Sequence, residues 1–189
     1  PVLRTGIDST VYYIDFSFDK LKLGGSAFAQ SLDKIGKEVP TVQDSEYFAN
    51  AFNAVQELIN KELILAGHDI SAGGMITTML EMNFANTEGG LEVSLDEIPE
   101  KDLVKILFSE NPGILIQVEK TDEVEKILKK AGVAFIRLAR PCDERHLLIH
   151  KDGADYQFFI DHLRDVWFES SYLLDRKPVS YTHLTLPTI

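Results

Sequence analysis

Runs of apolar residues with alternating or helical spacing divide the chain into short strands and helices. β-Branched and aromatic runs predict strands at 11–16, 64–66, 91–95, 114–118, 133–138, 147–150 and 156–160. Apolar residues at helical spacing predict helices on Phe28, Leu32 and Ile35; Phe48, Phe52, Val55 and Ile59; Met75, Met79, Leu80 and Met82; Val124, Ile127 and Leu128; and Leu163, Val166, Trp167 and Leu174, with a sixth over 101–108. This mixed order, without uniform βαβ repeats, predicts an α+β layered domain rather than a doubly wound parallel sheet.

Helix ends can also be read from the sequence. Gly36 should end the first predicted helix, and Asp44 or Ser45 should begin the second. Thr121 should cap the helix that follows it.

Charge and cysteine content narrow the function classes. The 189 residues carry 19 Lys and Arg against 30 Asp and Glu, a formal net charge of −11. Nucleic-acid and anionic-membrane surfaces need clustered cations, so neither is an expected partner. No apolar run approaches the roughly 20 residues of a membrane span. The sole cysteine, Cys142, excludes an intrachain disulfide and favours a reducing, cytoplasmic compartment.

Two glycine-containing turns are candidates for ligand chemistry, and the first lies at the start of a predicted helix. Gly24, Gly25 and Ser26 precede that helix, where glycines let a ligand approach the backbone and the first N–H groups of the helix are unpaired. A phosphate fits such a place. The turn lacks the Gly-Lys-Ser/Thr of a P-loop, and a simple helix cap is the alternative interpretation.

The second turn joins a predicted buried strand to a helix. Asp69 offers the hard oxygen that Mg²⁺ prefers, Ser71 offers a hydroxyl, and Gly73 and Gly74 open the backbone to the same ligand. The alternative is structural: Asp69 or Ser71 caps the helix and His68 is a satisfied partner.

The residues 23–30 and 68–74 together resemble paired signatures of the C-terminal domain of the aminoimidazole-ribonucleotide-synthetase-like (AIR-synthetase-like) ATP-binding superfamily. The segments 108–118 and 163–172 narrow the resemblance to the large, single-chain phosphoribosylformylglycinamidine synthases. The resemblance covers about residues 1–177. It implies a layered α/β sandwich of the AIR synthetase C-terminal domain type, taken from the second half of the synthetase core.

Members of this family use ATP and glutamine to convert formylglycinamide ribonucleotide to formylglycinamidine ribonucleotide in purine synthesis. The domain that this chain resembles holds an additional, mainly structural nucleotide site, so the resemblance implies Mg²⁺ and ATP or ADP as ligands. Matched to the motif, Asp69 binds Mg²⁺, Ser71 contacts the nucleotide, and the phosphate neighbours are Gly24, Gly25, Ser26, Gly73 and Gly74. Ala72 stands where many relatives carry Asp, which puts the affinity for the metal in question.

The resemblance also predicts how the chain is divided. Residues 1–160 form the domain, 161–178 begin the connection towards a glutaminase, and 179–189 resemble the read-through translation of a sequencing adaptor, with a natural tail as the alternative. The sequence begins at Pro1 without Met or a signal peptide, which favours a chain that begins inside a longer protein. The isolated chain should therefore be inactive, and apolar surface that normally contacts the other synthetase half and the glutaminase should be exposed.

Other readings and residues stay open to test. The chain could belong to another ATP-using member of the superfamily, an aminoimidazole ribonucleotide or selenophosphate synthetase, or be a non-catalytic interaction module. Glu110 could approach a ligand from its loop, whereas Cys142 is interpreted as an incidental thiol. His146 and His150, four residues apart on a predicted strand, lie roughly 13 Å apart and cannot share one metal ion. The aromatic residues Tyr156, Phe158, Phe159 and Trp167 have core or interface spacing.

Overall fold

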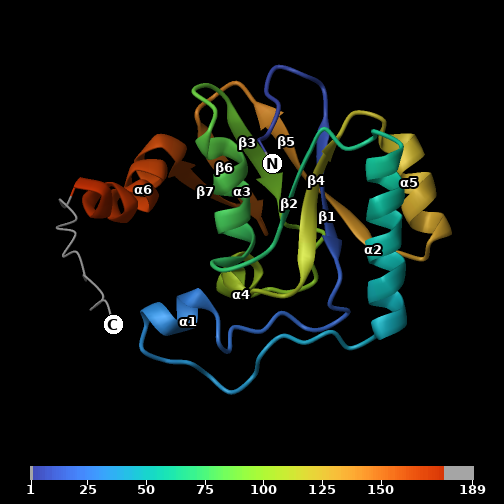
Figure 1. Ribbon diagram of the computed structural model, residues 1–189, viewed down its shortest axis with the longest axis horizontal. Coiled ribbons are helices and arrows are strands. Elements are labelled where there is room, and N and C mark those ends of the chain that lie inside the picture. The colour runs from blue at the N-terminus through green and yellow to red at the C-terminus, as the bar shows by residue number, and fades with distance from the viewer. Residues whose placement is uncertain (1, 177–189) are drawn as a thin grey trace, which may run out of the picture.

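A computed structural model describes residues 2–176, which form seven strands and six helices around one mixed sheet (Figure 1). The strands are β1 (Thr10–Asp15), β2 (Ala66–Asp69), β3 (Gly90–Ser94), β4 (Gly113–Val118), β5 (Phe135–Cys142), β6 (His146–Lys151) and β7 (Ala154–Phe159). The helices are α1 (Ala27–Ser31), α2 (Ser45–Asn60), α3 (Gly74–Phe84), α4 (Leu103–Phe108), α5 (Thr121–Lys130) and α6 (Ile160–Arg176). The predicted number of elements and the α+β layered class are confirmed.

The sheet runs in the order β2-β4-β1-β5-β3-β6-β7. Neighbouring strands pair antiparallel except β3 and β6, which are parallel. β1 lies between β4 and β5, with Tyr12 opposite Ile116 on one side and Arg137 on the other. Asp152 and Gly153 join β6 to β7 with φ of 50° and 80°. Positive φ at both residues is what a tight type I′ hairpin needs.

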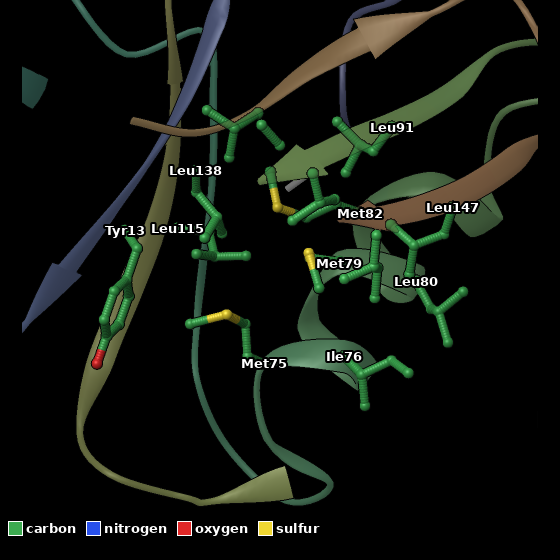
Figure 2. Packing of buried hydrophobic residues seen from close by; sticks show 14 of the residues in the cluster. Tyr13, Met75, Ile76, Met79, Leu80, Met82, Leu91, Leu115, Leu138 and Leu147 are labelled. Atoms are coloured by element: carbon green, nitrogen blue, oxygen red, sulfur yellow. The ribbon is translucent and has the colours of Figure 1, made fainter. Parts of the chain in front are cut away.

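Alternation along the strands builds two cores, one on each face of the sheet. Tyr12 and Ile14 point to the side covered by α2 and α5, whereas Val11 and Tyr13 point to the side covered by α3. Figure 2 shows the α3 side, where the helix presents methionines to leucines of the sheet: Met75, Met79 and Met82 against Leu91, Leu115, Leu138 and Leu147. The three methionines are almost fully buried, as their spacing predicts.

The first predicted helix is wrong in its extent. α1 ends at Ser31, and both Leu32 and Ile35 are exposed. The backbone turns back after the helix: the N–H of Gly24 donates to Glu38 O and the N–H of Gly25 donates to Ile35 O. A helix that continued to Gly36 could not make these bonds, so a long-range backbone contact overrides the local apolar period.

The predicted face of α2 is also partly wrong, although Asp44 does cap the helix. Phe52 and Ile59 are exposed, and the buried face consists of Ala51, Ala54, Val55 and Leu58. The small alanines let the helix lie close to the sheet, which leaves the two larger side chains outside.

Other boundaries differ from the expectation as well. β2 spans Ala66–Asp69 rather than 64–66, because its pairing with β4 runs from Ala66 opposite Gln117 to Asp69 opposite Ile114. β5 is shifted to Phe135–Cys142, and Ile160 begins α6 instead of ending a strand. α5 has Lys120 rather than Thr121 at its N-cap position and lacks a side-chain cap hydrogen bond.

α6 projects from the sheet beside α3 (Figure 1). Trp167 contacts Phe84 with ring centroids 5.4 Å apart, yet it remains 55% exposed. Other large apolar side chains are exposed as well: Phe159, Val166, Phe168, Tyr172 and Leu173. The expected exposed apolar surface is therefore present. The segment 179–189, with its predicted adaptor origin, lies outside the described residues.

Candidate functional site

The turn between β2 and α3 leaves its polar side chains unused by the helix start. α3 has Gly73 at its N-cap, with a left-handed φ of 89° and no side-chain cap hydrogen bond. Asp69 and Ser71, the residues that could have capped it, are both exposed. The Asp69 carboxylate is 78% exposed. The capping alternative for these two residues is therefore not what the structure shows.

Backbone contacts hold this turn in place. The N–H of Ile70 donates to Gly113 O at 2.9 Å, which extends the pairing of β2 with β4 past Asp69. Thr78, one turn into α3, donates from its hydroxyl to Asp69 O at 3.2 Å. Asp69 consequently lies at a fixed point on the sheet edge, while its side chain faces solvent.

His68 is a satisfied partner, as the structural alternative proposed. Its Nδ1 lies 2.8 Å from Asp69 O, and its Nε2 lies 3.3 Å from a carboxylate oxygen of Glu81 on α3. Both ring nitrogens have a neighbour within the protein, so the imidazole helps to join β2 to α3.

The glycine at the start of α3 has a packing role of its own. Gly74 has φ of 74°, and a Cβ there would lie 2.6 Å from Leu107 O and 2.8 Å from backbone atoms of Phe108. The backbone of α3 thus begins directly against the end of α4. A side chain at this position is excluded both by conformation and by space.

The first glycine turn is closed by its own cap. The buried Ser26 hydroxyl accepts from the N–H of Ala29 at 3.2 Å and donates to Leu23 O at 2.7 Å. Gly25 has φ of 76°, and Gly24 lies so close to Glu38 that a Cβ would collide with its carbonyl. Whether Gly24, Gly25 or Ser26 contacts a phosphate stays a prediction.

Glu110 brings the two turns together. One of its carboxylate oxygens, Oε1, accepts from the N–H of Ala27 at 2.7 Å and from the N–H of Gly73 at 2.8 Å. A stacked pair of rings, Phe28 on Phe108, lies beside this bridge with centroids 4.7 Å apart. The two sequence signatures, which are far apart in the chain, thus form one surface site.

The neighbouring Asn111 organises the irregular segment that precedes the first turn. Its buried amide donates from Nδ2 to Ser17 Oγ and to Lys20 O, both at 3.1 Å, and its Oδ1 accepts from the N–H of Lys22. Sequence analysis singled out Glu110 as a loop residue that could approach a ligand, but it missed the bridge that Glu110 makes and the whole contribution of Asn111. The run of turn-forming residues around them was visible in the sequence, but the partners of Asn111 lie about ninety residues away.

A cleft of about 720 Å³ lies next to this segment. It is lined by Phe18, Asp19, Lys20, Lys22, Gln43, Asp44 and Ser45. The Lys22 ammonium, 2.6 Å from the Asp19 carboxylate, holds the pKa of Asp19 at about 2. The N–H of Thr41 also donates to Asp19 Oδ2, which joins the chain just before α2 to this segment.

A second group of chemically active side chains lies at the turn that joins β5 to β6, which are separated in the sheet by β3. Donor atoms of Cys142, Glu144 and His146 lie within 4.8 Å of one another. Burial, with help from the Glu144 charge, raises the pKa of the Cys142 thiol. His150 is not part of this group; it lies between Glu92 and Asp155. The separation of His146 from His150 was inferred correctly, but strand spacing does not apply across the turn that joins Cys142 to His146.

Comparison with protein families gives one clear match. The profile of the family described as AIR synthase related protein, C-terminal domain, matches residues 10–147.

Individual relatives share the chain at moderate identity. A probable phosphoribosylformylglycinamidine synthase, chloroplastic/mitochondrial, from Arabidopsis thaliana is 35% identical over 175 residues, covering 90% of this chain and 12% of that protein. The phosphoribosylformylglycinamidine synthase of Homo sapiens is 32% identical over 170 residues, covering 87% of this chain and 13% of that protein. The chain therefore spans about an eighth of the length of these curated relatives.

Solved structures share the fold. T. maritima PurL complexed with ATP superposes with a TM-score of 0.65 at 15% identity, over 86% of this chain and 27% of that one. T. maritima PurL complexed with FGAR gives a TM-score of 0.65 at 20% identity, over 86% of this chain and 28% of that one.

Proposed function

This chain belongs to the family of AIR synthase related proteins, C-terminal domain, and on that premise we propose that it is part of a phosphoribosylformylglycinamidine synthase. The full enzyme would convert formylglycinamide ribonucleotide to formylglycinamidine ribonucleotide with ATP and glutamine. This chain would be the C-terminal domain of the second synthetase half and contribute one side of a Mg-nucleotide site. The names of the Arabidopsis and human relatives support this assignment.

One observation carries the assignment of the site. α3 begins without a side-chain cap, while Asp69 and Ser71 beside it are exposed. In a purely structural turn, an Asp or Ser at this place would cap the helix and stabilise it by about 1 kcal/mol. Leaving both side chains exposed and out of the cap, with the Asp69 carboxylate 3.6 Å from Nδ1 of His68, favours a role towards a ligand.

The donor set fits a magnesium ion carried by a nucleotide. Mg²⁺ usually takes one or two protein carboxylates and completes its shell with phosphate and water oxygens. Asp69 supplies one exposed carboxylate at the end of β2, and Ala72 supplies none. When bound, Mg²⁺ would offset the negative charge of the phosphates.

The protein's own contribution is orientation. The 2.9 Å bond from the N–H of Ile70 to Gly113 O fixes the backbone beside Asp69, and the Ser71 hydroxyl lies within the same exposed turn. Gly73 and Gly74 keep the start of α3 free of side chains, and a phosphate that approaches there would compete with Glu110 for the N–H of Gly73. Glu110 holds the first turn against the second.

Calorimetry with Mg-ADP tests the site. We expect Asp69→Asn to weaken binding roughly tenfold or more, about 1.4 kcal/mol. The matched control is Asp122→Asn, an exposed aspartate in the first turn of α5, which should bind like the parent chain. Absence of binding by the parent chain, or equal binding by both variants, would favour a non-catalytic interaction module.

The isolated chain should have no synthase activity. We expect no product when it is mixed with ammonia, ATP and formylglycinamide ribonucleotide, because the other synthetase half and the glutaminase would supply the rest of the machinery. The exposed apolar residues of α6, such as Trp167 and Phe168, support contact with such domains. We further propose a cytoplasmic location and partners limited to nucleotide and these domains, without nucleic acid or membrane. Among residues 2–176, no helix is both long and apolar enough to cross a bilayer.

A further inference from the structure

The turn that joins β5 to β6 across the end of β3 lies on a different part of the sheet from the proposed nucleotide site and gathers three metal-binding side chains. Cys142 ends β5, Glu144 lies in the turn and His146 begins β6. The thiol sulfur, a carboxylate oxygen and a ring nitrogen all lie within 4.8 Å of one another. Cys142 and His146 are half-buried, and Glu144 is exposed.

Arg145, between Glu144 and His146, anchors the turn. Arg145 donates from Nε to Asp161 on α6 at 3.0 Å, and from Nη1 to the carbonyls of Asn83 and Gly89 at 3.2 and 3.1 Å. These bonds tie the turn to the end of α3, to the start of β3 and to the first turn of α6. The turn that carries Glu144 and His146 is therefore held in place by the arginine between them.

The neighbouring strand adds a second constraint. Gly90 of β3 pairs with Cys142, and a Cβ at Gly90 would lie 2.6 Å from Glu144 O and collide with the carbonyl of His146. The β3 backbone thus lies directly against the turn. On the other side, the side-chain amide of Gln157 on β7 lies 3.3 Å from Nδ1 of His146. With its amide oxygen turned towards the ring, Gln157 would accept the Nδ1 proton and leave Nε2 free to bind a metal, which is the outer contact that histidine ligands usually make.

We propose that Cys142, Glu144 and His146 form a three-ligand site for Zn²⁺. Thiolate and imidazole are ligands that zinc favours over Mg²⁺ and Ca²⁺, and one carboxylate completes a common zinc set. Donors around a tetrahedral zinc ion lie roughly 3.5 Å apart, so small side-chain rotations close the observed spacing. The fourth position is open to water or to a ligand from a neighbouring domain.

Cobalt provides a direct probe, because a thiolate bound to Co²⁺ gives a charge-transfer absorption band. Cys142 is the sole cysteine of the 189-residue chain, so any such band reports this residue alone. We expect Co²⁺ added to the full, reduced chain to produce the band at one ion per chain. Zn²⁺ should abolish it, and excess Mg²⁺ should leave it unchanged.

Variants separate a built site from surface binding. Cys142→Ser should remove the band, and His146→Gln and Glu144→Gln should each weaken Co²⁺ and Zn²⁺ binding roughly tenfold or more. The control is His162→Gln, an exposed histidine on α6, which should bind like the parent. Glu144 is exposed, so its substitution should leave the fold intact, and circular dichroism verifies this for every variant. Absence of the band in the parent, or affinities of Glu144→Gln and His146→Gln within about twofold of the parent, would mean adventitious binding and overturn the proposal.

Discussion

Replacing Gly74 by Ala should destabilise the domain far more than the same change at Gly132. Both glycines have positive φ, 74° at Gly74 and 68° at Gly132. Both substitutions therefore incur the cost of a left-handed alanine, about 1–2 kcal/mol. The two sites differ in space. A Cβ at Gly74 would lie 2.6 Å from Leu107 O, whereas a Cβ at Gly132 would meet nothing within 4 Å.

The extra cost at Gly74 comes from overpacking. Pushing the backbone of α3 away from the end of α4 costs about 1–3 kcal/mol beyond the conformational term. The total for Gly74→Ala is therefore about 2–5 kcal/mol, against about 1–2 kcal/mol for Gly132→Ala.

Urea unfolding of the parent and the two variants measures this difference. Equal losses of unfolding free energy in both variants would refute the packing argument. Gly74 would then serve only to open the backbone to a ligand.

Two other predictions concern the bridge and the segment beside it. Glu110→Ala leaves the N–H groups of Ala27 and Gly73 without their shared acceptor and should lower the unfolding free energy by about 1–3 kcal/mol. Glu110→Gln, which keeps an acceptor oxygen, should lose about half as much. A lower unfolding free energy for Glu110→Gln than for Glu110→Ala, measured in urea, would contradict the bridge. Lys22 lowers the pKa of Asp19 from 3.8 to about 2, so this carboxylate stabilises the fold above its unfolded pKa and its contribution is lost as the pH falls through its folded pKa. The stability difference between the parent and Asp19→Asn should accordingly shrink over that range, and a difference that stays constant would argue against the ion pair.

Elements whose apolar period matches one packing partner were predictable from the sequence. The methionines of α3 and the alternating Leu91, Val93 and Leu95 each face a single core, so their burial follows from local spacing alone. In β1, alternate residues face opposite sides of the sheet, so each residue also packs into one core. Local pattern and tertiary packing agree in these places.

Elements set by long-range backbone contacts were not predictable in this way. α1 ends at Ser31 because the carbonyls of Ile35 and Glu38 accept hydrogen bonds from the glycine turn. The residues of α1 do not themselves indicate these bonds. In α2 the alanines lie on the buried face and Phe52 is exposed, because close approach of the helix to the sheet requires small side chains.

The candidate site likewise combines motifs that the sequence predicts with long-range contacts that it does not. The two glycine turns stand out in the sequence, but their connection runs through Glu110, whose partners are 83 and 37 residues away. The group of Cys142, Glu144 and His146 likewise depends on the turn between β5 and β6, which an argument from spacing along one strand cannot describe. Motifs locate single loops, whereas the contacts between loops require the fold.

The charge of the site constrains how a nucleotide would enter under the proposed function. Asp69, Glu81 and Glu110 all belong to or contact the β2–α3 turn, within a chain of net charge −11. Phosphates brought alone to this surface would meet carboxylates at close range, an unfavourable arrangement in which like charges repel. The N–H of Gly73 is moreover already bound to Glu110. A phosphate that takes this donor must displace the Glu110 carboxylate, and a cation beside both groups would reduce their mutual repulsion. The nucleotide should therefore bind as its Mg²⁺ complex, with the metal required for binding rather than added to it.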